Sequence, residues 1–241
     1  MQKFEHYLLT KFNKGLYTQS QKTKGDRKAR DEWMVHRIRL FEKYCFPSIK
    51  SQVNQDFKWI VIFDRKTPKE FLRKIEEYTQ YKNFIPVFDG WFDHHIKKLL
   101  RPETQYLITT RIDNDDAFHK NAIKKIQLHF AKDNLAYARD FFLNFPIGYC
   151  LDEQTGQITL NGSKSNPFIT LVEKVKRGPK AVSIKTVRCM NHSHLDRLGK
   201  IKQICTTTPM WVQVIHKRNI SNRVRGNPIP KEQFRRKDFG F

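Results

Sequence analysis

Hydrophobic positions over roughly the first half of the chain alternate between two periods. Dense apolar runs of strand length occupy residues 4–12, 57–63, 84–88 and 106–110. Between them, apolar residues recur at helical spacing over residues 31–50, 67–81, 94–100 and 121–131. Runs without a polar face, such as 57–63, suit parallel strands that are covered on both sides. The alternation predicts an α/β fold, an open mixed sheet of the Rossmann-like kind with helices on both faces.

The second half of the chain is less regular. Strand-like patterns occur at residues 136–144, 155–160 and 211–215, and residues 196–205 resemble a helix. Residues 167–174 fit either state. Residues 19–30 predict a basic loop, and the Arg-, Pro- and Gly-rich residues after 219 predict a basic tail or lid. We find no internal repeat and no domain boundary, so we expect one domain over residues 1–241.

Several classes are disfavoured by composition. No apolar run approaches the ~18 residues needed to span a bilayer, and the first residues lack the apolar stretch of a secretory signal. We therefore expect a cytoplasmic protein. The four cysteines form no CxxC pair, which favours free buried thiols over a zinc site or a disulfide framework.

The charge balance is strongly basic. Lys and Arg number 46 against 24 acidic residues, a net charge of +22. This surplus favours an anionic partner, whether nucleic acid, an anionic membrane surface or a phosphate-bearing small molecule. A generally basic surface with no specific partner explains the same number.

Acidic residues end two of the predicted strands. Asp64 follows residues 57–63, and the cluster Asp113-Asn114-Asp115-Asp116 follows residues 106–110. In open α/β sheets, ligands bind at the carboxyl ends of the strands. Clustered carboxylates repel one another unless a cation lies among them, and their hard oxygens suit Mg²⁺ or Mn²⁺. The cluster therefore indicates a clamp for a nucleotide diphosphate, and its alternative is a solvated turn that caps the next helix.

Several strings, in order along nearly the whole chain, resemble a known family. They are His6-Tyr-Leu-Leu-Thr-Lys-Phe-Asn13, Phe57-Lys-Trp59, Ile108-Thr-Thr-Arg-Ile-Asp-Asn-Asp-Asp-Ala117, Asn166-Pro-Phe-Ile-Thr-Leu-Val-Glu173 and Trp211-Val-Gln-Val-Ile-His216. They are similar to the putative rhamnosyltransferase family of bacteria and viruses, within the GT-A glycosyltransferases that carry a DxD motif. The resemblance implies a nucleotide-sugar-binding half at residues 1–120, an acceptor half at 121–218 and the tail or lid at 219–241.

The resemblance also implies a reaction, the transfer of a sugar from a nucleoside-diphosphate sugar to an acceptor hydroxyl. Asp64 matches the acid that holds the donor base, although a turn-capping role fits it nearly as well. Asp113 matches the first acid of DxD, near the ribose and the metal, and Asp115 matches the second, a direct ligand of Mn²⁺ or Mg²⁺. Arg111 departs from the apolar residue common at its position, and it either reaches a phosphate or neutralises the acids beside it.

GT-A enzymes commonly complete the metal site with a late histidine. His216 ends the strand-like run 211–215 and is our candidate ligand, with His192 and His194 as rivals. An imidazole suits Mn²⁺ better than Mg²⁺.

An inverting enzyme also needs a carboxylate that takes the acceptor proton. Glu173 is the first candidate and Asp152 the second, and the alternative for Glu173 is a surface acid beside lysines. Arg225 is expected to close over the donor diphosphate, unless it belongs to a solvated basic tail.

Two other functional classes stay open at this stage. A basic nucleic-acid-binding protein would explain the charge, although no known reading motif is present. A Mg²⁺-dependent phosphoryl-transfer enzyme would explain the acids, although no P-loop is present. A transferase whose acceptor is a glycan, a lipid-linked glycan at an anionic membrane, or DNA would account for both features.

Overall fold

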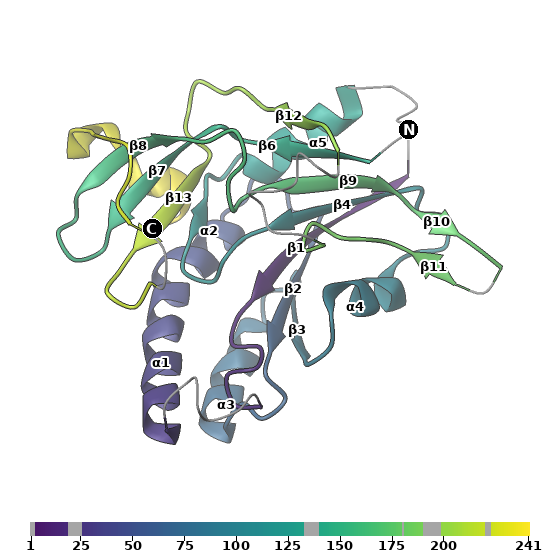
Figure 1. Cartoon of the computed structure of the whole chain (residues 1–241), viewed down its shortest axis with the longest axis horizontal. Helices are drawn as coiled ribbons and strands as arrows, with labels where there is room; N and C mark the ends of the chain where they lie inside the picture. The colour runs from purple at the N-terminus through teal and green to yellow at the C-terminus, as the bar shows by residue number, and fades with distance from the viewer. Residues whose placement is uncertain (1–2, 19–25, 133–139, 180, 190–198, 220–222) are drawn as a thin grey trace.

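The computed structural model describes residues 3–18, 26–132, 140–179, 181–189, 199–219 and 223–241. Within these ranges the chain forms a seven-stranded sheet, a five-stranded sheet and a two-stranded ribbon, with helices packed on the larger sheet (Figure 1).

The larger sheet has the strand order β12-β6-β9-β4-β1-β2-β3. Its strands are β1 (Phe4–Lys11), β2 (Lys58–Phe63), β3 (Phe84–Phe88), β4 (Tyr106–Arg111), β6 (Phe141–Asn144), β9 (Thr170–Lys174) and β12 (Ile201–Gln203). The neighbours β4, β1, β2 and β3 run parallel, and β9 runs antiparallel to β4. In the centre, Leu8 of β1 lies between Trp59 of β2 and Thr110 of β4. Five of these strands were predicted: β1, β2, β3 and β4 from their apolar runs, and β6 from the strand-like pattern over residues 136–144.

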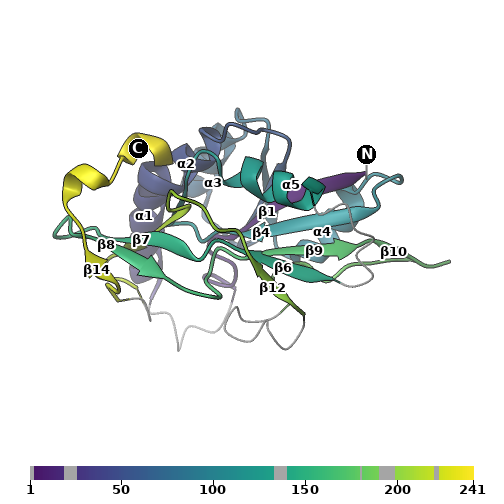
Figure 2. The same ribbon diagram turned by 90° about the horizontal axis from the view of Figure 1, so that it is seen from above.

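Helices cover both faces of this sheet. They are α1 (Arg27–Leu40), the π-helical turn η2 (Phe41–Cys45), α2 (Phe46–Lys50), α3 (Lys69–Tyr78), α4 (Phe92–Leu99) and α5 (Ala122–Lys132). Leu8 packs with α1, α2, α3 and α5 on one face, whereas Tyr7 and Leu9 pack with α4 on the other. Figure 2 shows α2, α3 and α5 along one side of the strands. The predicted α/β class, an open mixed sheet with helices on both faces, is confirmed.

The first helical segment begins earlier than its hydrophobic pattern predicts. The Asp26 carboxylate accepts the backbone N–H of Ala29 at 2.8 Å and caps α1, so residues 27–30 are helical rather than part of a loop. Residues 19–25 of the predicted loop lie outside the described residues. Pro47 lies in the first turn of α2, after the π turn, and the helical segment ends at Lys50, as predicted.

The smaller sheet has the order β14-β8-β7-β13-β5. Its strands are β5 (Ala117–Phe118), β7 (Ile147–Asp152), β8 (Ile158–Gly162), β13 (Trp211–Ile215) and β14 (Asn227–Pro228). The ribbon pairs β10 (Lys176–Arg177) with β11 (Val182–Ser183). Because β4 ends at Arg111 and β5 begins at Ala117, the acidic cluster forms the connection between the two sheets.

The helix predicted over residues 196–205 is wrong where the structure describes it. Ile201–Gln203 forms the edge strand β12, parallel to β6, and the carbonyl of Lys200 accepts the N–H of Phe142 at 2.9 Å. Pairing with β6 overrides the helical pattern of this short segment. Residues 170–174, which fitted either state, form β9. Residues 196–198, and 136–139 of another predicted strand, lie outside the described residues.

The C-terminal residues pack against the body instead of forming a free tail or lid. After β14 come two short 3₁₀ turns, η4 (Lys231–Gln233) and η5 (Arg236–Phe239). Phe234 and Phe239 are buried, and both rings contact the ring of Tyr149 in β7. Figure 2 shows this yellow segment beside α1 and α2. Burial of two aromatic rings fixes the segment despite its basic composition.

The cysteines are free: Cys45 and Cys150 are buried, whereas Cys189 and Cys205 are exposed. Across the described ranges, no helix has both the length and the apolar character needed to cross a bilayer.

Candidate functional site

Asp64 and the acidic cluster both lie at the carboxyl edge of the parallel strands, one on each side of β1. Asp64 follows β2, and Asn13 accepts its backbone N–H through Oδ1 at 2.9 Å. Asn114 of the acidic cluster donates to the carbonyl of Phe12 at 3.4 Å. Because neighbouring strands are about 4.8 Å apart, Asp64 and the end of β4 lie roughly 10 Å apart across β1. The topology thus brings together two regions far apart in the sequence.

The acidic cluster meets β13 through Asp115 and His216. Asp115 Oδ2 lies 2.9 Å from His216 Nε2, and both side chains are almost completely buried. A third group from α1 completes the triangle, because Arg37 Nη1 lies 2.5 Å from Asp115 Oδ2 and 2.9 Å from His216 Nε2. A carboxylate, an imidazole and a guanidinium from three separate elements therefore converge on one point.

The other ring nitrogen of His216 faces two neighbours. The backbone N–H of Arg218 donates to Nδ1 at 3.2 Å, and Nε2 of His36 lies 3.3 Å from the same atom. With Nδ1 as acceptor, Nε2 carries the proton and donates to Asp115. With the proton on Nδ1 and directed at His36, the lone pair of Nε2 is available to a ligand. Burial, together with the charge of His216, lowers the pKa of His36 to about 4.

Asp113 lies between two arginines rather than facing Asp115. Its Oδ2 accepts from Arg111 at 2.8 Å and its Oδ1 accepts from Arg188 at 3.1 Å. Burial alone would raise the pKa of Asp113, but the charges of Arg188 and Arg111 outweigh it and lower that pKa. Burial lowers the pKa of Arg188 to about 10, and its Nε is buried without a hydrogen-bond partner. Such an orphaned donor beside a carboxylate marks a place where a further acceptor would be stabilised.

Asp116 joins the two sheets. Its Oδ1 accepts the backbone N–H of Val214 in β13 at 2.9 Å. Burial, followed by the charges of Asp115 and Asp113, raises the pKa of Asp116 well above its usual range. The repulsion expected within the cluster is thus relieved by the guanidinium groups that contact Asp113 and Asp115.

The Asp64 carboxylate accepts hydrogen bonds from two neighbouring loops. It accepts the N–H groups of Tyr17, Thr18 and Lys66 at 2.9 to 3.0 Å, as well as the Thr18 hydroxyl. Burial alone would raise the pKa of Asp64, but these hydrogen bonds lower it. The carboxylate caps the turn before Thr67 through the N–H of Lys66, which is the turn of the capping alternative, and it also holds the chain after β1 through Tyr17 and Thr18.

The structure does not bring Glu173 to the acidic cluster. Glu173 pairs with Leu107 in the β9–β4 register, about four residues, or roughly 13 Å, before the carboxyl end of β4. It accepts the N–H groups of Lys185 at 2.7 Å and Thr186 at 2.9 Å, and burial raises its pKa. This geometry is that of a buried cap for a loop, not of a surface acid beside lysines.

Asp152 lies closer to the buried pair. It ends β7 directly beside Ile215 of β13, so it neighbours His216 across the sheet. Its Oδ1 accepts the N–H groups of Gln154 and Thr155. Arg225, expected over the diphosphate, has an exposed side chain, and its carbonyl accepts the Thr159 hydroxyl of β8.

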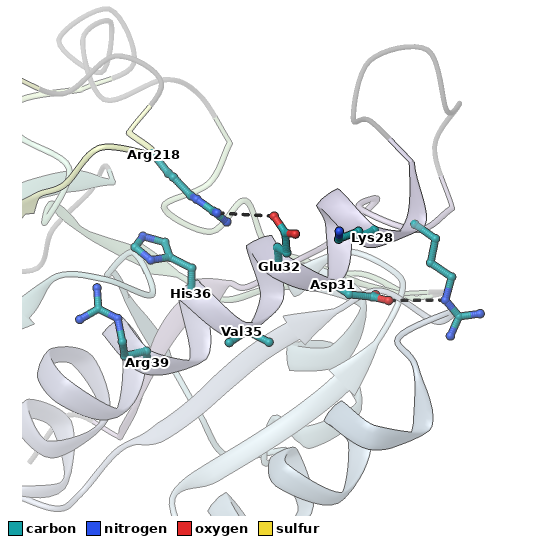
Figure 3. A pocket seen from close by; sticks show the side chains of 8 residues that line it. Lys28, Asp31, Glu32, Val35, His36, Arg39 and Arg218 are labelled. Carbon is teal, nitrogen blue, oxygen red and sulfur yellow. Dashed lines mark ion pairs between the residues drawn. The ribbon is translucent and has the colours of Figure 1, made fainter.

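A surface pocket adjoins the buried pair. It has a volume of about 770 Å³ and is lined by Arg27, Lys28, Asp31, Glu32, Val35, His36, Arg39 and Arg218. Figure 3 shows Glu32, His36 and Arg39 projecting from α1 on the side that Arg218 approaches. Arg218 pairs with Glu32 at 3.8 Å. Because His36 also contacts His216, the pocket reaches the back of the buried imidazole.

The pair Asp115 and His216 fits two neighbouring ligand positions of a divalent cation. At metal–ligand distances of ~2.1 Å, adjacent octahedral ligands are about 3 Å apart, close to the observed 2.9 Å. No group of three or more His, Cys, Asp or Glu suited to a metal occurs among the residues that the structure describes. A two-ligand site of this kind is typical of Mg²⁺-like ions completed by substrate phosphates and water. His192 and His194, the rival ligands, lie outside the described residues.

Sequence reasoning missed Arg37 and Arg188. The position of Arg37 could have been noticed in the sequence. It shares one face of the helix with three residues that are buried, Arg30, Met34 and Phe41. A charged residue on the inward stripe of a helix indicates a buried partner. Arg188 lies after β11 in irregular chain, and no local pattern distinguishes it.

Comparison with known proteins places the chain in a family. The model of the "Putative rhamnosyl transferase" family matches residues 4–228. Among solved structures, TarS of S. aureus (residues 1–349) is similar with a TM-score of 0.45 and 11% identity, over 88% of this chain and 60% of that one. A 4-diphosphocytidyl-2C-methyl-D-erythritol synthase from Anaerococcus prevotii is similar with a TM-score of 0.37 and 13% identity, over 84% and 86%.

No curated protein matches the chain. The chain spans less than two thirds of the TarS chain with which it aligns. The family model matches most of the length of the chain, including the acidic cluster at the carboxyl edge of the larger sheet. The chain belongs to the putative rhamnosyl transferase family.

Proposed function

We propose that this protein transfers a sugar from a nucleoside-diphosphate donor to an acceptor hydroxyl, with a divalent cation held by Asp115 and His216. The observation that carries the proposal is the 2.9 Å approach of Asp115 Oδ2 to His216 Nε2 at the junction of the two sheets. A carboxylate and an imidazole so close together favour Mn²⁺ over Mg²⁺. The bound ion would offset negative charge on the departing diphosphate.

The donor lies, in this proposal, along the carboxyl edge from Asp64 to Asp113. Asp64 shapes the base end of the site through the backbone of Tyr17 and Thr18. Asp113 stays ionised between Arg111 and Arg188, so it can accept from ribose hydroxyls. The unpartnered Nε of Arg188 supports a further anionic contact there. Arg225 stays a predicted contact of the diphosphate.

The acceptor proton is assigned to Asp152 rather than to Glu173. Asp152 neighbours His216 across two parallel strands, whereas both oxygens of Glu173 accept backbone N–H groups of a buried loop. A general base must reach the hydroxyl that attacks, on the face opposite the leaving diphosphate. The pocket along α1, with its basic rim, provides room for an anionic or glycan acceptor beside the buried pair.

Thermal unfolding with a panel of nucleoside diphosphates tests the proposal. A ligand present at a hundredfold excess over its Kd stabilises by about 2.7 kcal/mol, which corresponds to a rise in Tm of about 5–10 °C for a chain of this size. We expect one base to give this rise with Mn²⁺ and not with EDTA. Equal rises with EDTA, or in the Asp115→Asn variant with Mn²⁺, would contradict the proposed metal site.

A further inference from the structure

The guanidinium of Arg37 contacts both of the atoms that would hold a divalent cation, Asp115 Oδ2 and His216 Nε2. Its Nη1 lies 2.5 Å from Asp115 Oδ2 and 2.9 Å from His216 Nε2, and those two atoms are themselves 2.9 Å apart. An ion at ~2.1 Å from both of them would lie within about 4 Å of Nη1, wherever it was placed around the pair. Two cations at that separation repel strongly, and the single negative charge of the Asp115 carboxylate that they would share offsets only part of this repulsion.

Arg37 cannot relieve this repulsion by losing its charge, because a guanidinium stays protonated in proteins. It can relieve it only by moving. The side chain is 18% exposed and reaches the pair from α1, a separate element, so a path toward the surface exists. Its Nε is buried without a hydrogen-bond partner, so the observed position of the side chain leaves one donor of the guanidinium unpaired.

We propose that Arg37 is an internal counter-ion that competes with the divalent cation for Asp115 and His216. This inference rests on the proposed function and adds a residue that sets metal affinity. In the free protein, Arg37 neutralises Asp115, so the apparent affinity for a metal alone is reduced by the cost of displacing the guanidinium. A diphosphate that arrives with the ion adds negative charge and offsets that cost. Metal and nucleotide therefore bind better together than separately.

The competition predicts that removing the charge of Arg37 strengthens Mn²⁺ binding, although most substitutions beside a metal site weaken it. In Arg37→Met and Arg37→Gln, the Kd for Mn²⁺ without nucleotide should tighten by about tenfold or more. Arg39→Met is the matched control, because Arg39 carries the same charge on the same helix but pairs with Glu153 at 2.8 Å. Its Kd should stay within about twofold, since exposed charges act weakly over distance. Titration of free Mn²⁺ by electron paramagnetic resonance measures each value.

The outcomes separate this inference from the proposed function. If both Arg37 variants unfold like the wild type yet bind Mn²⁺ no more tightly, the competition is refuted, while Mn²⁺-dependent nucleotide binding by the wild type would keep the proposed site. If a tight Mn²⁺ site in Arg37→Met persists after His216→Ala is added, the ion is bound elsewhere and the inference is also refuted. If neither wild type nor variants bind Mn²⁺, with or without nucleoside diphosphate, both proposals are refuted.

Discussion

Asp115 and His216 are 101 positions apart in the chain, yet Oδ2 of one lies 2.9 Å from Nε2 of the other. The contact exists because Asp115 follows the last residues of β4 whereas His216 follows β13 of the second sheet, and β13 pairs with β5 directly after the acidic cluster. The account of function depends on this junction more than on any single strand.

Substitution of His216 tests its role without removing a carboxylate. We expect His216→Ala to weaken Mn²⁺-dependent nucleotide binding by about 100-fold or more, since even indirect partners of metal ligands contribute tenfold or more. His95→Ala is the control, because His95 lies on α4, where its Nε2 is 2.8 Å from the carbonyl of Asp89. Calorimetric titration with and without Mn²⁺ provides the measurement, and equal affinities for the two variants would remove His216 from the site.

The turn-capping role of Asp64 predicts a loss of stability. Asp64→Ala leaves the N–H groups of Tyr17, Thr18 and Lys66 without their acceptor, which should cost about 1–3 kcal/mol of unfolding free energy. Asp93→Ala removes a partly exposed pair with Lys97 and the contact of the carboxylate with the first turn of α4, and it should cost no more than about 1 kcal/mol. Urea unfolding compares them. An Asp64→Ala variant as stable as the wild type would restrict Asp64 to ligand binding.

Glu5 makes stability depend on acid pH. Burial alone would raise the pKa of Glu5, but hydrogen bonds from Lys58, Thr104 and the Arg101 backbone outweigh it and lower the pKa to about 2. As pH falls below about 4.5, the unfolded chain takes up this proton before the folded protein does, so stability is lost between pH 4.5 and 2. The contribution at pH 7 is about 3 kcal/mol.

Urea unfolding at several pH values checks this sign. Glu5→Gln should be less stable than the wild type at pH 7, and the difference should shrink toward pH 2. Glu76→Gln, at an exposed position of α3, should follow the wild type throughout. A difference for Glu5→Gln that stays constant with pH would contradict the lowered pKa.

The packed C-terminus predicts a structural role for Phe239. Its side chain is 1% exposed and contacts Tyr149 and Phe234. Phe239→Ala should cost about 3–5 kcal/mol of unfolding free energy, whereas Arg236→Ala, at an exposed position, should change it by at most about 0.5 kcal/mol. If Phe239→Ala instead keeps its stability and loses only donor binding, the segment is a lid after all.

Sequence reasoning worked best where local pattern and tertiary role agree. The apolar run 57–63 predicts β2 because a strand covered on both faces needs no polar positions. It did not predict β7, because Gly148 interrupts the pattern of strand-forming residues. Glycine is needed there because a Cβ would lie 1.9 Å from the ring of Trp211. Glycine at that position is required by a residue far along the chain, and no local rule reveals the contact.

Within the candidate site, too, some residues could be predicted from the sequence and others could not. The carboxylates at strand ends could be located from the sequence, because the carboxyl edge is where ligands bind an open sheet. Their counter-ions could not, since Arg37 and Arg188 approach from α1 and from irregular chain, across the fold. Glu173 was selected for its position in a family-like string, whereas the β9 register places it away from the cluster.

Anomalous diffraction from crystals grown with Mn²⁺ and a nucleoside diphosphate tests the central claim most directly. The account predicts a manganese peak about 2.1–2.3 Å from both Asp115 Oδ2 and His216 Nε2, with the diphosphate on its open side and Arg37 turned away. A bound nucleotide with no manganese at these two atoms, or manganese at another group of residues, would contradict it.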